Sequence, residues 1–380
     1  ASLALASPSS SSRSASRRHS QSLMGCGAAA GSRPHVAYAA SAASGVEISS
    51  APGSDVGQAE AAIAVIADEA GARDVGARTD AIIIDGKALA EAVLAEVKVG
   101  VGRLVTSSCT APCLVVVLVG CNPASKSYVK RKEDAAASCG ILARVLELQE
   151  DISQDSLLAE VERLNGDNDV HGIIVQMPLP AHIDEVTVAD AIDVLKDVDG
   201  FSPVHIGNTA LSGRQPLFSP CTPQGCLHMI KSLGVTLRGK DAVVVGASNI
   251  VGMPMQLLLL KEGCTVTTCH IDTVDVCSYT RRADILVVAV GKAELVRGDW
   301  IKPGAIVIDV GINFVEDPSR KAGRRMVGDV AFEEALRVAG SVSPVPGGVG
   351  PMTVAMLLRN TLAAADNAAR RLADGETEKN

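Results

Sequence analysis

The segment Asp241-Ala-Val-Val-Val-Gly246-Ala-Ser-Asn-Ile-Val-Gly252-Met-Pro254 decides the fold of this chain. A β-branched apolar run ends in a tight turn at Gly246, and Gly252 and Pro254 suit the first turn of a following helix. Such a strand–turn–helix unit presents backbone N–H groups and the positive end of a helix dipole to a pyrophosphate. Ser248 stands where the usual G-x-G-x-x-G pattern has its second glycine, so the segment favours nucleotide binding without establishing it alone.

On both sides of this segment, short β-branched runs alternate with helical patterns, which is typical of a parallel α/β sheet. The strands expected before it are Ala81–Ile84, Leu114–Val119, Arg144–Leu148 and Gly172–Gln176, and the helices are Gly86–Leu104, Ala124–Ser138, Gln154–Asn165 and Val186–Leu195. The strands expected from it onward are Ala242–Val245, Thr265–Cys269, Ile285–Val290 and Ala305–Val310, and the helices are Pro254–Lys261, Phe332–Val338 and Met352–Leu372. This layout predicts two α/β domains with a ligand cleft between them.

The boundaries expected from this layout divide the chain into four parts. A first α/β domain covers residues 80–220 and is completed by residues 343–372, whose helix returns to it; a Rossmann-like domain covers 221–342. Residues 1–46 contain four arginines, many serines and alanines and no acidic residue, a composition typical of an organelle transit peptide. Serine richness favours a plastid over a mitochondrion, and a low-complexity tail is the alternative. Residues 47–79 are expected to be a linker.

Composition excludes several classes of function. The 380 residues include only 1 Trp, 3 Tyr and 4 Phe, and the net charge is -8, which argues against a nucleic-acid-binding surface. No apolar run reaches the roughly 18–20 residues that span a bilayer. The 10 cysteines include no CxxC pair, so we expect reduced thiols and no metal site.

Tyr128 and Lys132 lie four residues apart and therefore share one face of the expected helix. A phenol and an amine on one face can stack a ring and move a proton, but such pairs are also common on ordinary exposed helices. Short-chain dehydrogenases use a Tyr-x-x-x-Lys pair that follows the nucleotide turn. Here the pair precedes Gly246, which excludes that assignment.

Three further segments carry polar or conformationally restricted residues at expected strand ends and turns. Gln176 ends an apolar strand, where side chains of parallel sheets face the ligand crevice. Asp199 lies in an acidic loop that can accept hydrogen bonds from amino or amide donors or form a plain turn. The Gly/Pro-rich stretch Pro344–Thr353 precedes a helix, and its density of restricted residues favours contact with a ligand.

Together these segments resemble the bifunctional methylenetetrahydrofolate dehydrogenase/methenyltetrahydrofolate cyclohydrolase family from Ile82 to Ala369. The matching blocks, in order, are Val119-Gly120 with Pro123-Ala-Ser-x-x-Tyr128-Val-x-x-Lys132, Gly172-Ile-Ile-Val-Gln176-Met-Pro-Leu-Pro180, Lys196-Asp-Val-Asp199-Gly-Phe201, Pro220-Cys-Thr-Pro223-x-Gly225, Gly246-x-Ser-Asn-Ile-Val-Gly252, Asp309-Val-Gly-Ile-Asn313 and Pro344-Val-Pro-Gly-Gly-Val-Gly-Pro-Met-Thr353.

The resemblance implies a homodimer that carries out two consecutive reactions. A hydride passes from 5,10-methylenetetrahydrofolate to NADP, and water then opens the methenyl bridge to give 10-formyltetrahydrofolate. By position, Lys132 would stabilise the reacting species and pass protons, and Gln176 would hold its amine or the attacking water. Tyr128 would stack on the folate and Asp199 would bind the pterin. Gly347, Gly348 and Pro351 would lie beside the substrate and the nicotinamide.

The expected nucleotide contacts come from the turn, the end of the next strand and two later strand ends. They are Gly246, Ser248, Ile250, Val251, Gly252, His270, Asp272, Thr273, Val290, Gly291 and Ile312. Asp272 stands where the family often has a basic residue, and a carboxylate suits a ribose 2′-OH better than a 2′-phosphate. NAD is therefore the alternative cofactor.

Other functions remain open at this stage. Glu133 and Asp134 follow Lys132, where the family usually has basic residues, so a dehydrogenase without hydrolase activity is one alternative. A catalytically inactive folate- or nucleotide-binding regulator is another. An amino-acid dehydrogenase with the same domain plan is a third, although the blocks at Gln176 and Pro344–Thr353 do not support it.

Overall fold

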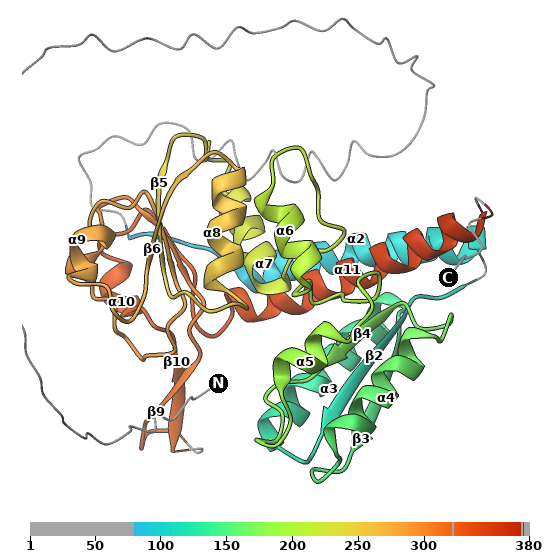
Figure 1. Ribbon diagram of the computed structural model, residues 1–380. Helices are drawn as coiled ribbons and strands as arrows, with labels where there is room; N and C mark the ends of the chain where they lie inside the picture. Colours follow the sequence, from blue (N-terminus) through green and yellow to red (C-terminus); the bar gives the residue numbers. More distant parts are fainter. Residues whose placement is uncertain (1–79, 109, 321–322, 374, 376–380) are drawn as a thin grey trace, which may run out of the picture. The chain divides into compact units, whose positions relative to one another are not determined.

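The computed structural model describes residues 80–108, 110–320, 323–373 and 375, which belong to one compact unit (Figure 1). The expected transit peptide (1–46) and linker (47–79) lie outside the described residues. Within the described part, the predicted mixture of parallel sheets and covering helices is confirmed: a three-stranded and a six-stranded sheet, both parallel, are connected by long helices.

The three-stranded sheet has the order β3-β2-β4, with β2 (Cys113–Val119) in the centre between β3 (Leu142–Leu148) and β4 (Gly172–Val175). Every residue of β2 is buried, because side chains alternate between two apolar layers. Leu114, Val116 and Leu118 join the cluster on the side of α3 (Pro123–Cys139). Val115, Val117 and Val119 pack on the side of α4 (Gln154–Asn165).

The six-stranded sheet has the order β1-β11-β8-β7-β5-β6. Its strands are β1 (Ile82–Ile83), β5 (Asp241–Val245), β6 (Thr265–Cys269), β7 (Ile285–Val288), β8 (Ile306–Asp309) and β11 (Ser341–Val342). Its connections include α8 (Gly252–Lys261), α9 (Val276–Thr280), α10 (Phe332–Ala335), a 3-10 turn at Gly298–Trp300 and the antiparallel ribbon of β9 (Asn313–Glu316) and β10 (Arg324–Val327). The expected nucleotide segment thus forms β5, its turn and α8.

One strand differs from the expected division of the chain. Residues 80–220 were assigned to the first domain, but Ile82 and Ile83 pair with Ser341 and Val342 at the edge of the six-stranded sheet. The physical reason is that β11 has an open edge whose backbone groups need partners, and the chain passes it just before α2 begins. The remaining boundaries stay a prediction.

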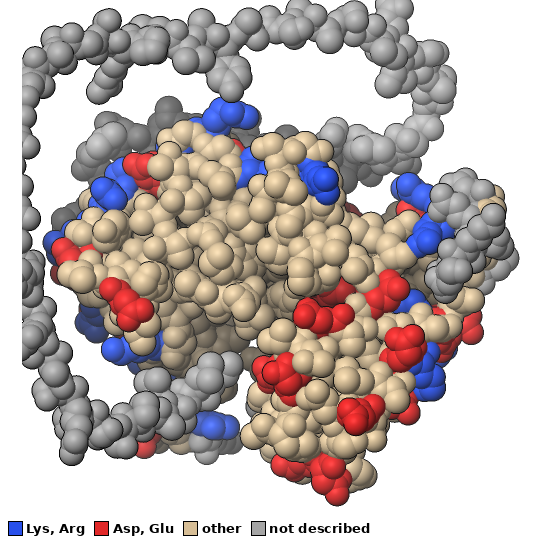
Figure 2. Space-filling model, in the orientation of Figure 1, with Lys and Arg blue, Asp and Glu red and all other residues tan. Residues whose placement is uncertain are grey.

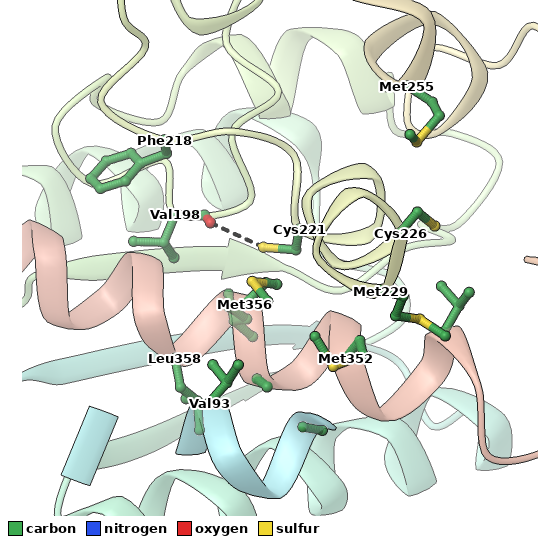
Figure 3. Close-up of a cluster of buried hydrophobic side chains, with 14 of the residues drawn as sticks. Val93, Val198, Phe218, Cys221, Cys226, Met229, Met255, Met352, Met356 and Leu358 are labelled. Atoms are coloured by element: carbon green, nitrogen blue, oxygen red, sulfur yellow. Dashed lines mark hydrogen bonds between the residues drawn. The ribbon is translucent and has the colours of Figure 1, made fainter. Parts of the chain in front are cut away.

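Helix α11 (Val349–Ala373) lies alongside α2 (Gly86–Ser108) and also packs on α7 (Cys221–Lys231) (Figure 1). Figure 3 shows the cluster that these helices share, in which Met352 and Met356 of α11 lie between Val93 and Met229. The same buried cluster continues to Val244 and Ile308 of the six-stranded sheet and to Val116 of the three-stranded sheet. One face of each sheet is therefore covered by a common apolar core.

Most expected helices and strands are present with shifted ends, and three helices differ in instructive ways. The helix expected at Val186–Leu195 is only α5 (Glu185–Asp190). The helices α6 (Pro203–Ala210) and α7 were not predicted, and both contain a proline. Pro203 and Pro223 lie in the first turns, where a missing N–H group costs no intrahelical hydrogen bond.

Charge is unevenly distributed over the face shown in Figure 2. Acidic side chains gather over the part that contains α3, α4 and α5, whereas lysines and arginines lie mainly over the six-stranded-sheet part and the end of α11. Among the described residues, no helix combines the length and the apolar character that a membrane crossing requires.

Gly86 allows the start of α2 to touch the Gly/Pro-rich loop. A Cβ atom at Gly86 would overlap the carbonyl carbon and oxygen of Gly348, which are backbone atoms and cannot rotate away. Gly102, in the same helix, is exposed and a Cβ atom there would meet nothing within 4 Å. Substitutions at the two positions therefore distinguish the close contact that requires a glycine at Gly86 from the general effect of glycine on helix stability.

We expect Gly86→Ala to lower the free energy of unfolding by about 1–3 kcal/mol because of the overlap with the loop. Gly102→Ala should raise it by roughly 0.5–1 kcal/mol, because alanine restricts the unfolded chain and favours the helix. Urea unfolding of both variants measures the difference. An equal stabilisation by both substitutions would contradict the close contact between Gly86 and Gly348.

Candidate active site

A cleft of about 600 Å³ opens between the ends of the two sheets. Its walls come from α2, α3, the segment that follows β8, the Gly/Pro-rich loop and the start of α11. The lining residues used below are Tyr128, Arg131, Lys132, Thr222, Val251, Asp309, Gly311, Ile312, Gly347, Gly348, Pro351 and Thr353. Asp309, at the carboxyl end of β8, lines the cleft, and the carboxyl ends of parallel strands are the usual position of ligand sites in such folds. The part that contains the three-stranded sheet contributes residues of α3 to the lining.

Lys132 and Gln176 are in direct contact beside the cleft. The Nζ atom of Lys132 on α3 donates a hydrogen bond to Oε1 of Gln176 at 3.1 Å. Gln176 follows β4, and its side-chain Nε2 donates to the carbonyl oxygen of Met177 at 2.8 Å, which orients Oε1 toward the amine. Gln176 is not itself part of the cleft lining, so it reaches the cleft through Lys132.

Tyr128 lies four residues before Lys132 on the same face of α3, and both side chains line the cleft. The phenol ring of Tyr128 is 39% exposed, although it is one of only three tyrosines in the chain. The guanidinium carbon of Arg131 lies 5.8 Å from the centre of this ring. The sequence analysis did not single out Arg131; its position next to Lys132 was the available signal.

Asp134, one of the two acids that follow Lys132, pairs with another lysine. Asp134 forms an ion pair with Lys130 at 2.6 Å, one helical turn away from it. This pair lies on the exposed side of α3, outside the cleft. Asp134 therefore pairs with Lys130, whereas Lys132 contacts Gln176.

Asp199 is half-buried in the loop after α5 and does not belong to the cleft lining. Burial raises the pKa of its carboxyl group, and the positive charge of Lys132 acts in the opposite direction. The neighbouring Asp197 is buried, and its carboxylate accepts hydrogen bonds from the N–H groups of Gly200 at 3.1 Å and Ser202 at 2.6 Å. Burial raises the pKa of Asp197 to about 6. Asp197 thus fixes the backbone around Asp199.

The loop that carries Asp199 is also held by α7 and α11. Nδ2 of Asn360 on α11 donates to the carbonyl oxygens of Val198 at 2.8 Å and Ser219 at 3.1 Å. The Sγ atom of Cys221 donates to the same Val198 oxygen at 3.3 Å (Figure 3). Burial, above all, raises the pKa of the Cys221 thiol well above its usual value, which makes this cysteine a packed neutral group.

The Gly/Pro-rich loop forms one wall of the cleft through Gly347, Gly348 and Pro351. Gly347 has φ +107°, a conformation that side chains with a Cβ atom rarely adopt. A hydrogen bond of 3.0 Å joins the hydroxyl groups of Thr353 and Thr222, and thereby links α11 to α7. The loop therefore lines the cleft, and its predicted contact with a ligand stays a prediction.

The nucleotide turn has the geometry that its glycines indicate. Gly246 has φ +120°, and a Cβ atom there would overlap the carbonyl oxygen of Ala289; one at Gly252 would overlap the carbonyl oxygen of Gly246. The Oγ atom of Ser248 accepts from the N–H group of Val251 at 3.2 Å, so this serine stabilises the turn itself. The close backbone packing places this turn directly before the N-terminus of α8, where free backbone N–H groups are suited to binding a phosphate.

Of the expected nucleotide residues, only Val251 and Ile312 line the 600 Å³ cleft. The others lie along the carboxyl edge of the six-stranded sheet, where Ile250 is 53% and Val290 36% exposed. At the end of β6, the N–H group of Asp272 donates to Nδ1 of His270 at 3.2 Å, while the carboxylate of Asp272 is exposed. The N–H group of His270 in turn donates to the hydroxyl oxygen of Thr273 at 2.9 Å.

The sequence analysis missed two buried acids next to this edge, Asp309 and Asp329, which are 3% and 0% exposed. Asp309 ends β8 and lines the cleft. Burial raises the pKa of Asp309 to about 7. Asp309 begins one of the matching sequence blocks, whereas nothing in the pattern around Asp329 indicated a role. Within the described ranges, no three His, Cys, Asp or Glu side chains are grouped as metal ligands.

Two models of known protein families match successive ranges of this chain, and both ranges contain residues of the site. Residues 84–199 match the family model described as "Tetrahydrofolate dehydrogenase/cyclohydrolase, catalytic domain". Residues 220–369 match the model described as "Tetrahydrofolate dehydrogenase/cyclohydrolase, NAD(P)-binding domain". The first match includes Lys132 and Gln176, and the second includes the nucleotide turn and the Gly/Pro-rich loop.

Individual proteins are similar over the same region. "Bifunctional protein FolD 2" of Arabidopsis thaliana is 53% identical over 74% of this chain and 94% of its own length. "Bifunctional protein FolD 4, chloroplastic" of the same organism is 50% identical over 77% of this chain and 81% of its own length. The solved structure of the Trypanosoma brucei N5,N10-methylenetetrahydrofolate dehydrogenase-cyclohydrolase, complexed with NADP cofactor and inhibitor, superimposes with a TM-score of 0.74 at 42% identity, over 77% of this chain and 99% of that one.

Proposed function

This chain belongs to the tetrahydrofolate dehydrogenase/cyclohydrolase family, and we propose that its cleft carries out both reactions with Lys132 as the central catalytic residue. The enzyme oxidises 5,10-methylenetetrahydrofolate to 5,10-methenyltetrahydrofolate and hydrolyses that product to 10-formyltetrahydrofolate. The observation that supports the assignment of Lys132 is its 3.1 Å hydrogen bond to Gln176 at the wall of the cleft.

In the hydrolytic step, water adds to the methenyl carbon and loses a proton, which leaves a hydroxyl group on that carbon. The bond from the carbon to one folate nitrogen then breaks as the nitrogen gains a proton, and the hydroxyl group releases its own proton to solvent and becomes the formyl carbonyl. The amine of Lys132 in its neutral form can take the first proton, and as the ammonium group it can return that proton to the leaving nitrogen. The oxygen of Gln176 keeps this amine at the cleft wall, because its own amide N–H group is fixed on Met177.

In the oxidation step, the nicotinamide accepts the hydride from the methylene carbon when it is bound. The protein's part is to hold the two rings in contact and to exclude water. Tyr128 and the loop containing Gly347, Gly348 and Pro351 line the cleft that the folate would occupy. Asp199, held by the backbone around Asp197, is proposed to bind the amino and N–H donors of the pterin.

We further propose NADP as the cofactor and NAD as the second candidate. The close turn at Gly246 and Gly252 supports a dinucleotide, and the family resemblance supports NADP. The exposed carboxylate of Asp272 favours NAD, because it would lie near a 2′-phosphate and repel it.

The remaining proposals concern the leader and the assembly. The composition of residues 1–46 and the chloroplastic relative support a plastid transit peptide, with the mitochondrion as the alternative. The family resemblance supports a homodimer, for which sedimentation equilibrium should give twice the chain mass; a monomer mass would contradict it.

Lys132→Met should reduce hydrolysis of methenyltetrahydrofolate at least a hundredfold, because the cleft loses its proton-transferring amine. The dissociation constant for NADP should stay within twofold of the wild-type value. Lys130→Met is the matched control, since Lys130 pairs with Asp134 outside the cleft. Loss of methenyl absorbance in the absence of nucleotide measures hydrolysis, and full activity of Lys132→Met would exclude the assigned role.

Asp272→Asn tests the choice of cofactor. If the carboxylate repels a 2′-phosphate, the substitution should raise kcat/KM for NADP about fivefold or more and leave kcat/KM for NAD unchanged or lower. Initial rates of the two proteins with each nucleotide measure this change. A strong preference for NADP in the unaltered enzyme would show that Asp272 does not discriminate between the two.

A fusion of residues 1–79 to a fluorescent protein tests the leader. We expect import into isolated plastids together with shortening of the fusion, because an Arg- and Ser-rich, acid-free segment has the composition of a transit peptide. Import into mitochondria alone would favour the alternative compartment. A fusion that enters neither organelle would contradict the proposal.

A further inference from the structure

Two buried carboxylates, one of which lines the cleft, lie close together. Asp309 and Asp329 are nearly inaccessible to solvent, and among the described residues neither forms an ion pair with a lysine, arginine or histidine. A Cβ atom at Gly311 would overlap the carboxyl group of Asp329, and one at Gly328 would overlap that of Asp309. The two glycines therefore make room for the carboxylates against the backbone.

Asp329 accepts hydrogen bonds from the turn after β7. Its Oδ2 atom accepts from the N–H groups of Val290 at 2.7 Å and Gly291 at 2.9 Å. Its Oδ1 atom accepts from Nδ2 of Asn313 at 2.8 Å. Gly291 has φ +68°, so one carboxylate oxygen holds two successive N–H groups of a left-handed turn.

Asp309 in turn holds the backbone of Asp329. Its Oδ1 atom accepts from the N–H groups of Asp329 at 2.9 Å and Gly311 at 3.0 Å, and its Oδ2 atom accepts from Val330 at 2.9 Å. Gly311 lines the cleft, while Val290 and Gly291 lie at the edge where the nucleotide is proposed to bind. The pair therefore connects the cleft wall to the nucleotide edge through hydrogen bonds alone.

Burying a carboxylate without a cation costs free energy that an apolar side chain would avoid. A core role alone does not require this arrangement, because apolar residues could fill the space. An ionised or shared-proton carboxylate can, however, hold several N–H groups in one fixed geometry. The two acids thus provide what apolar residues could not, which is a fixed conformation of the Val290–Gly291 turn.

We propose that Asp329 is a positioning residue for the nicotinamide nucleotide, which fixes the Val290–Gly291 turn, and that Asp309 acts behind it by fixing Asp329. This inference rests on the proposed function, because it takes Val290 and Gly291 as nucleotide contacts. It concerns the dehydrogenase reaction, which uses the nucleotide, and not hydrolysis at Lys132, which does not.

The test is Asp329→Ala, with binding and both reactions measured separately. The dissociation constant for NADP, measured by calorimetry, should rise about tenfold or more, with a matching fall in dehydrogenase kcat/KM. Hydrolysis of methenyltetrahydrofolate without nucleotide should stay within threefold of the wild-type rate. A general loss of structure would reduce both reactions together, and that result would overturn the proposal.

Two further variants complete the test. Asp329→Asn keeps one side-chain oxygen for the N–H groups of Val290 and Gly291, so its dissociation constant should lie between those of the wild type and Asp329→Ala. Asp329→Asn also replaces Asp329→Ala in the test if Asp329→Ala does not fold, and a dissociation constant within twofold of the wild-type value would then overturn the proposal.

Asp317→Ala is the control. It removes an acid that binds Ser319 within the turn between β9 and β10, and NADP binding should not change. Absence of turnover in the unaltered enzyme would instead contradict the proposed function.

Discussion

The structure depends on one apolar core that two sheets share. Residues of α2, α7, α8 and α11 fill the space between one face of the three-stranded sheet and one face of the six-stranded sheet. Because apolar packing is dense and deforms little, this core sets how the two sheets lie relative to each other. The cleft is lined by α3 and by the segments that follow β8 and β11. The separation of these walls therefore depends on the packing of Met352, Met356 and their neighbours and not only on the polar residues that line the cleft.

Around this core, the polar part of the site is built from carboxylates that accept backbone N–H groups. Asp197 holds the loop of Asp199, Asp309 holds the segment after β10, and Asp329 holds the turn after β7. Asp309 ends β8, Asp329 follows β10, and Asp197 lies in the loop between α5 and α6. In these three places the acids accept hydrogen bonds from backbone N–H groups that loops leave unpaired. Elsewhere the hydrogen bonds of helices and strands satisfy such groups.

The sequence predicted those features that depend on neighbours along the chain. The apolar run of β2, the four-residue spacing of Tyr128 and Lys132 and the two glycines of the nucleotide turn all express local geometry, and the structure contains them. Features that depend on distant partners were not predicted. The pairing of Ile82 with Ser341 needs the order of the strands in space, and the contacts of Asp329 are mostly with backbone groups, which leave no trace in residue type. Helix α7 was not predicted either, although its Pro223 suits a first helical turn.

The short strand β1 has a consequence for how the enzyme reaches its folded state. It pairs with β11, and these two strands come from opposite ends of the described chain. The edge of the six-stranded sheet is therefore completed only after nearly the whole enzyme has been synthesised. Contacts between residues so far apart in sequence form late and slow the folding of a domain. In a newly made chain, the edge of β11 is therefore exposed until β1 pairs with it. This pairing covers the β11 edge and protects it from association with other chains.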